Sequence, residues 1–137
     1  MVEFEPVYVQ EFFRYLELKE LLTYGLCGVD LHAKGRRAED SMLIREAITK
    51  LEGFLSGPDE ALLSMLVGLE GWSPNAREEM LDFLKRVLSA LRDETQLSEG
   101  EYEEMLNRLM SLHDRLKSTY KDVEEKMLAR YRSRVVL

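Results

Sequence analysis

The sequence predicts an all-α protein: an antiparallel four-helix bundle with one short additional helix and a long C-terminal helix. Apolar residues recur at steps of three and four through four long segments, which is the spacing of helices with one buried face. Glycine and proline pairs separate these segments. The one alternating stretch, 4–9, is short and contains Pro6, so it does not predict a strand. A chain of 137 residues fits one domain, 1–137, with its own core.

The first helix is expected over Pro6–Tyr24, with proline at a first-turn position where a missing N–H has no consequence. Its apolar residues cover more of the circumference than one bundle core can bury. We therefore expect a second buried surface against a partner, and we assign the outlying apolar residues to a homodimer interface: Val9, Phe13, Leu18 and Leu21.

Gly25, Gly28 and Gly35 interrupt the pattern, so 25–37 reads as the long connection of the chain. A second helix is expected over Arg37–Ser56, ended by Gly57 and Pro58. Gly57 would also cap the short additional helix Pro58–Glu70, which has almost no polar side and must be covered by other elements.

A third helix is expected over Pro74–Thr95 with Ser73 as its N-cap. The remaining link, Gln96–Leu97, is so short that the third and fourth helices should lie antiparallel as neighbours. The fourth helix, Ser98–Arg134, opens with a capping box in which Glu101 stands three residues after Ser98. Its length of roughly 50 Å exceeds the width of a small domain, so one end should protrude or meet a partner.

The composition limits the cellular location and environment that we expect for the protein. The longest uncharged apolar run has too few residues to span a bilayer, and the acidic N-terminus does not read as a signal peptide. We therefore expect an intracellular, cytoplasmic protein without membrane contact. Cys27 is the single cysteine, so no intrachain disulfide can form. Charged residues rich in Glu and Arg, with few amides, favour ion-pair networks and a hot habitat.

No enzyme motif is present. A di-metal bundle site would place a glutamate three residues before a ligating histidine, and neither His32 nor His113 has one. Cys27 and Asp30 lie near His32 but are too few for a zinc site. The glycines match no phosphate-binding loop, and no nucleophile elbow occurs. We therefore predict no catalytic residue, no metal and no cofactor.

Charge is distributed unevenly along the chain. The stretch 93–104 contains six acids and no base, whereas 126–137 contains bases and no acid. A formal net charge of −7 disfavours nucleic acid as the partner. Cations near a helix C-terminus suit the helix dipole, and their excess here predicts that the tail meets an acidic surface of a second chain or a partner.

The length, the Glu- and Arg-rich helical composition and the lack of enzyme motifs together give the chain a likeness to known proteins. It resembles 137-residue proteins of unassigned role from spindle-shaped viruses of hyperthermophilic archaea. The resemblance extends over the whole chain and rests on no motif, so it transfers no functional residue. It implies a setting in the host cytoplasm or the virion, where a small bundle acts by contacting other proteins.

Two functions from different classes follow from these observations. The first is a non-catalytic protein–protein interaction or structural module that acts as a homodimer and contacts a protein partner that the sequence does not identify. The alternative is a DNA-binding regulatory protein that uses the basic loop and the C-terminal arginine tail. Its phosphate contacts would be made by Arg36, Arg37, Arg130, Arg132 and Arg134.

Overall fold

The computed structural model describes residues 6–135. It describes the surroundings of the side chains for residues 9–130 and for Arg132. Within this part of the chain all regular structure is helical, in six helices and no strand, so the all-α prediction is confirmed. The helices are α1 (Pro6–Ala33), α2 (Met42–Ser56), α3 (Glu60–Glu70), α4 (Ala76–Leu91), α5 (Glu99–Thr119) and α6 (Lys121–Val135).

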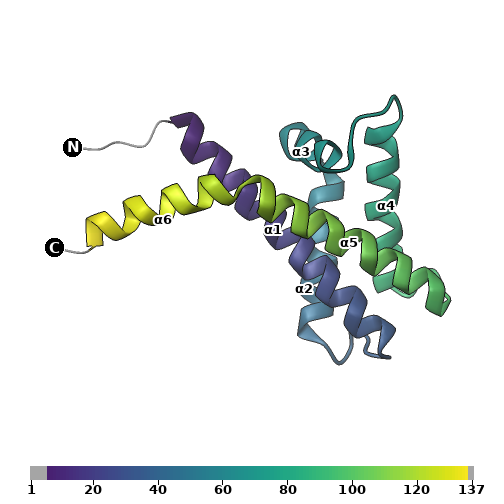
Figure 1. Cartoon of the computed structure of the whole chain (residues 1–137). Coiled ribbons are helices and arrows are strands. Elements are labelled where there is room, and N and C mark those ends of the chain that lie inside the picture. Colours follow the sequence, from purple (N-terminus) through teal and green to yellow (C-terminus); the bar gives the residue numbers. More distant parts are fainter. Residues whose placement is uncertain (1–5, 136–137) are drawn as a thin grey trace.

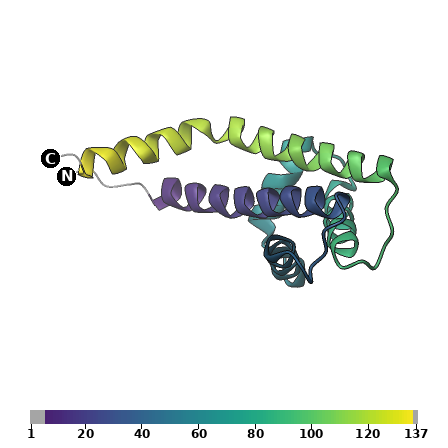
Figure 2. The same cartoon turned by 90° about the horizontal axis from the view of Figure 1, so that it is seen from below.

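Four of the helices pack as a bundle around one core. α1 and α5 run antiparallel side by side, and α2 and α4 form a second antiparallel pair that crosses the first (Figures 1 and 2). α3 joins α2 to α4 and covers one end of the core. α6 continues from α5 and leaves the body beside the N-terminal half of α1 (Figures 1 and 2). We call these two projecting pieces, 9–20 of α1 together with α6, the arm.

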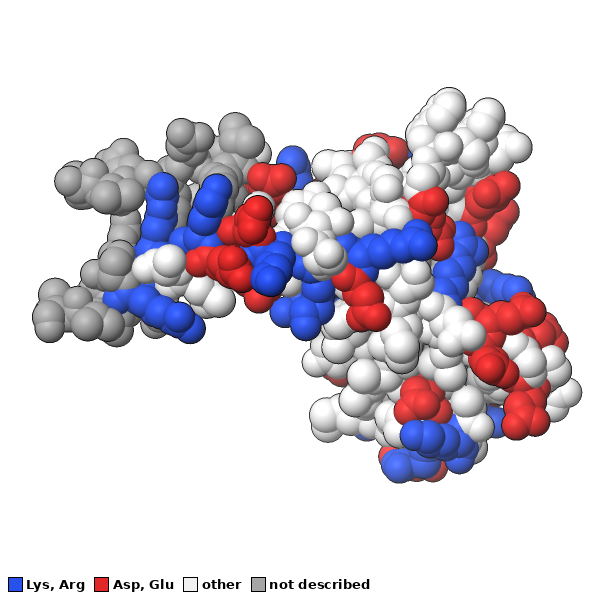
Figure 3. All heavy atoms as spheres, viewed as in Figure 1, with Lys and Arg blue, Asp and Glu red and all other residues white. Residues whose placement is uncertain are grey.

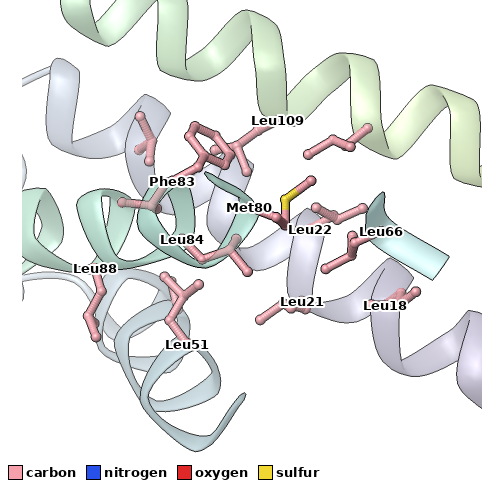
Figure 4. Close-up of a cluster of buried hydrophobic side chains, with 14 of the residues drawn as sticks. Leu18, Leu21, Leu22, Leu51, Leu66, Met80, Phe83, Leu84, Leu88 and Leu109 are labelled. Carbon is pink, nitrogen blue, oxygen red and sulfur yellow. The ribbon is translucent and has the colours of Figure 1, made fainter. Parts of the chain in front are cut away.

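The core is built from leucines that all five helices of the body contribute. Leu18 and Leu22 of α1, Leu51 of α2, Leu84 of α4 and Leu109 of α5 are each at most 1% exposed. Figure 4 shows these side chains with Leu66 of α3, converging from different helices on one cluster. Each buried leucine contributes about 1.5–3 kcal/mol relative to exposure, so this cluster is the main source of stability.

α1 continues nine residues beyond the predicted first helix. Gly25 and Gly28 lie inside it, and the prediction of a long connection from Gly25 was wrong. A Cβ at Gly28 would stand 3.0 Å from Cβ of Ala47, and one at Gly25 would stand 3.7 Å from Leu109. Glycine in a helix costs about 1 kcal/mol relative to alanine, and Gly28 lets α2 approach the α1 backbone closely, whereas a Cβ at Gly25 would make only an ordinary contact.

Side-chain caps fix where α2 and α3 begin. Oγ of Ser41 accepts the N–H of Ile44, so α2 starts five residues later than predicted. A carboxylate oxygen of Asp59 accepts the N–H of Ala61 at 2.8 Å, so Asp59 and not Gly57 caps α3. Glycine has no side chain to satisfy the first amides of a helix, which is why the cap moves to the acid.

α4 ends at Leu91, earlier than predicted, because Asp93 adopts a left-handed backbone with φ of 61°. The N–H of Glu94 donates to the carbonyl of Ser89 at 2.9 Å and closes the helix end. The link to α5 is therefore 92–98 and not two residues. With this longer link α4 crosses α5 at a steep angle (Figures 1 and 2), so the predicted antiparallel neighbourhood of these two helices is wrong.

The predicted C-terminal helix is divided in two at Tyr120, which leaves helical geometry with φ of −102° and ψ of 15°. Its start is as predicted: Ser98 and Glu101 exchange the two hydrogen bonds of a capping box. The Tyr120 ring stacks on Tyr15 with centroids 5.6 Å apart. This contact fixes the joint between α5 and α6 against α1.

Candidate functional site

The four residues predicted to form a dimer interface divide into two groups. Leu18 and Leu21 are 0% and 7% exposed and belong to the core of the single chain. They have no surface to offer a partner, because α1 is covered by neighbouring helices on these sides. Phe13 is 58% exposed and Val9 is half-buried, so these two remain on the surface.

The exposed apolar residues Phe13 and Leu16 lie on the same side of α1 as the half-buried Val9. Val9, Phe13 and Leu16 are spaced by four and three residues and share a face, which we call the α1 seam. Phe13 and Leu16 are the exposed large apolar residues of α1 among those described. A phenyl ring more than half exposed beside a second apolar side chain is typical of a protein-contact surface.

α2 covers the later part of the same face of α1. The next positions in this spacing are Glu20 and Tyr24. The Lys50 ammonium of α2 lies 2.6 Å from Oε1 of Glu20 and 4.9 Å from the centroid of the Tyr24 ring. Within the described part of the chain, α2 thus contacts this face of α1 from Glu20 onward, whereas Phe13 and Leu16 before it are exposed.

On the side away from the seam, α1 is bonded to α6. Oη of Tyr15 donates a short hydrogen bond to Glu124, and Nζ of Lys19 lies 3.7 Å from the same carboxylate. Burial, followed by this hydrogen bond and the negative charge of Glu124, raises the pKa of Tyr15 far above its ordinary value. The hydrogen bond from Tyr15 lowers the pKa of Glu124. The arm is therefore a defined pair of helices that can present the seam.

The predicted basic tail lies on the far end of the arm. Arg132 is exposed, and Arg130 is half-buried and interacts within the chain. The side chain of Arg134 lies outside the described residues. Figure 3 shows carboxylates gathered over the start of α5 and, at the opposite end of the molecule, cations together with carboxylates over α6. The acidic and basic ends of one chain therefore lie too far apart to pair with each other.

The predicted basic loop is occupied by contacts of its own. Nη2 of Arg36 donates to the carbonyl of Asp40 at 2.8 Å. Nε of Arg37 lies 3.1 Å from Oδ1 of Asp93, and its Nη1 donates to the carbonyl of His32 at 3.0 Å. The backbone N–H of Arg37 is the largest cause that lowers the pKa of Asp40. Both guanidinium groups thus hold the loop that joins α1 to α2.

Sequence reasoning missed a buried cluster around His32, which falls in the predicted connection 25–37 and is 3% exposed. Nε2–H donates to Oδ1 of Asp93 at 2.8 Å, and Oη–H of Tyr102 donates to Nδ1 at 2.6 Å when the ring is neutral. Burial raises the pKa of Tyr102. No local signal marked this cluster, because Asp93 falls inside the helix predicted over Pro74–Thr95.

The His32 cluster borders an open pocket of about 640 Å³ between the end of α1 and the start of α5. Both ring nitrogens are already hydrogen-bonded, so the imidazole offers no free base to a substrate. Its role is to join the C-terminal end of α1 to the link after α4 and to α5. We therefore read the cluster as a structural clamp, and the arm as the candidate functional site.

Three further observations concern metal binding, membrane-spanning helices and similarity to known proteins. Over the described residues, no three His, Cys, Asp or Glu side chains lie close enough together to bind a metal ion. Within the same range, no helix has the length and apolar character to cross a membrane. Comparison with models of protein families, with curated proteins and with solved structures finds no match.

Proposed function

We propose that this protein is a non-catalytic protein–protein interaction or structural module that acts as a homodimer. The observation that carries the proposal is the α1 seam, an apolar surface left bare where α2 stops covering α1. In this proposal the body of each chain, an antiparallel four-helix bundle of α1, α2, α4 and α5, is the scaffold that holds the seam in place. The arms of two chains then pack against each other about a twofold axis.

The free energy that the seam contributes reaches only the low end of the cost of association. Burying the remaining apolar surface of Phe13 and Leu16 contributes about 1 kcal/mol for each side chain, and a twofold interface counts each contribution twice. Association costs an estimated 4–15 kcal/mol in lost freedom of motion. The seam is therefore the centre of an interface and needs further contacts around it.

The DNA-binding alternative has less support. Arg36 and Arg37 are engaged by Asp40, Asp93 and backbone carbonyls, so a phosphate would have to displace these contacts. The net charge of −7 adds long-range repulsion. The likeness to proteins of archaeal spindle-shaped viruses extends the proposal to a setting, the infected cell or the virion, in which the dimer contacts a further protein.

The test compares two pairs of substitutions that each place two glutamates on exposed apolar positions. Phe13→Glu with Leu16→Glu alters the seam. Met42→Glu with Met110→Glu is the matched control, because these side chains are 71% and 50% exposed and lie on α2 and α5. We expect a folded monomer from the seam pair and a dimer from the control, by sedimentation equilibrium and circular dichroism.

Two results would overturn the proposal. One is a wild-type chain that is monomeric at micromolar concentration, or a seam variant that still dimerises. The other is tight binding of duplex DNA that weakens steeply with salt and is lost when Arg130 and Arg132 are changed to glutamate, which would support the alternative.

A further inference from the structure

A groove follows the seam directly along α1. It lies between α1, the second half of α2 and the start of α3, and its volume is about 310 Å³. Its floor is apolar, made by Leu18, Leu21 and Leu62 together with the half-buried ring of Phe54. A chain segment that covers the seam and continues along α1 would reach this groove, which is large enough for one or two side chains.

The rim of the groove is acidic. Glu17, Glu20 and Asp59 line it, and Lys50 is the one base among the lining residues. The ammonium of Lys50 is already 2.6 Å from Glu20, and this contact raises its pKa. Glu17 is exposed at the edge nearest the seam. An occupant with an apolar side chain and a neighbouring cation therefore matches the groove in shape and in charge.

One wall of the groove is bare backbone of α2. Gly53 lies within the helix, and a Cβ built on it would meet nothing within 4 Å. Unlike Gly28, it is required neither by a close helix contact nor by a left-handed backbone. A glycine inside a helix costs about 1 kcal/mol relative to alanine. The glycine leaves room for an occupant to approach the α2 backbone.

α6 carries the features that fit this groove. Leu128 is 43% exposed, and Arg132 follows one helical turn later on the same face. The sequence has no acid after Glu125. The α6 of the same chain packs on the Tyr15 and Lys19 side of α1 and projects away from α2 and α3 (Figures 1 and 2), so it does not reach the groove.

We propose that the groove between α1, α2 and α3 receives α6 of a second copy of this chain, with Leu128 on the apolar floor and Arg132 at Glu17. The inference rests on the proposed homodimer and supplies the contacts that the seam alone lacks. Each α6 then lies between the α1 of its own chain and the α1 of the partner copy.

A charge exchange tests the pairing of the two copies. Arg132→Glu and Glu17→Arg should each raise the dissociation constant of the dimer about tenfold, since each occurs twice in a twofold interface. The chain with both changes should return to within about threefold of wild type, because the opposite charges face each other again. Lys85→Glu, on the exposed side of α4, is the control and should leave the constant unchanged.

Gly53→Ala should have one effect on the thermal stability of the single chain and a different effect on dimerisation through the groove. In the monomeric seam variant it should raise the thermal midpoint by about 3 °C, because alanine favours the helix. In the wild-type background it should weaken dimerisation, because the methyl group takes the space of the occupant. If Gly53→Ala and the charge changes leave the dimer intact while the seam variant dissociates, the groove assignment is wrong and the homodimer stands. A wild-type monomer would refute both.

Discussion

The effect of replacing Asp93 by glycine on the free energy of unfolding should depend on whether residue 32 is histidine. Asp93 holds a left-handed backbone with φ of 61°, which glycine adopts without strain. Its carboxylate also accepts the Nε2–H of buried His32 and faces Arg37. The substitution therefore relieves strain in the backbone and removes an acceptor from a buried donor at the same time.

The relative sizes of these two effects decide whether the substitution stabilises or destabilises the chain. A left-handed residue other than glycine costs roughly 1 kcal/mol. A buried donor without a partner costs about 1–3 kcal/mol, and an exposed ion pair such as that with Arg37 contributes about 0.2–1 kcal/mol. Asp93→Gly should thus destabilise the wild-type chain by about 1–2 kcal/mol. In a His32→Leu background no buried donor remains, and the same change should be neutral or stabilise by about 0.5 kcal/mol.

Urea unfolding followed by circular dichroism measures all four chains of this cycle. Loss of the Tyr102 partner is common to both chains with His32→Leu and cancels in the comparison. Asp93→Ala is a useful addition, since it removes the carboxylate and keeps the strain, and should be the least stable of the single changes at this position. An Asp93→Gly effect of equal size in both backgrounds would refute the clamp.

Two further predictions concern packing and pH. Gly28→Ala should destabilise the chain by about 1–3 kcal/mol in thermal unfolding, because its Cβ would stand 3.0 Å from Ala47 and force α1 from α2; an unchanged midpoint would contradict the close approach. The raised pKa of Tyr15 means that the folded chain holds the phenol proton more tightly than the unfolded chain, so this stabilisation is complete below its ordinary value of 10.0 and is lost as pH rises above it. Tyr15→Phe should therefore flatten the fall in stability above pH 10, and a fall as steep as in wild type would count against the Tyr15–Glu124 contact.

The helices themselves were largely readable from the sequence, because apolar periodicity and breaks at glycine and proline report local geometry. The errors arose where distant elements decide. Gly25 and Gly28 read as a break, but their meaning depends on Ala47 and Leu109 arriving from other helices. A glycine placed for packing and a glycine placed for a turn look alike along a single chain.

The candidate site shows the same limit. Phe13 was identified as surplus apolar surface on α1, and the structure leaves it exposed. Leu18 and Leu21 were assigned to the same surface, because the extension of α1 and the crossing of α2 could not be read from the sequence. The pairing of His32 with Asp93 joins residues 61 positions apart and was equally invisible to local pattern.

The mass of the wild-type chain in solution tests the central claim most directly. Sedimentation equilibrium over a series of micromolar concentrations should give twice the 16.0 kDa mass of one chain, and the dimer should persist when salt is raised, because its centre is apolar. A mass of 16.0 kDa at every concentration would contradict the account.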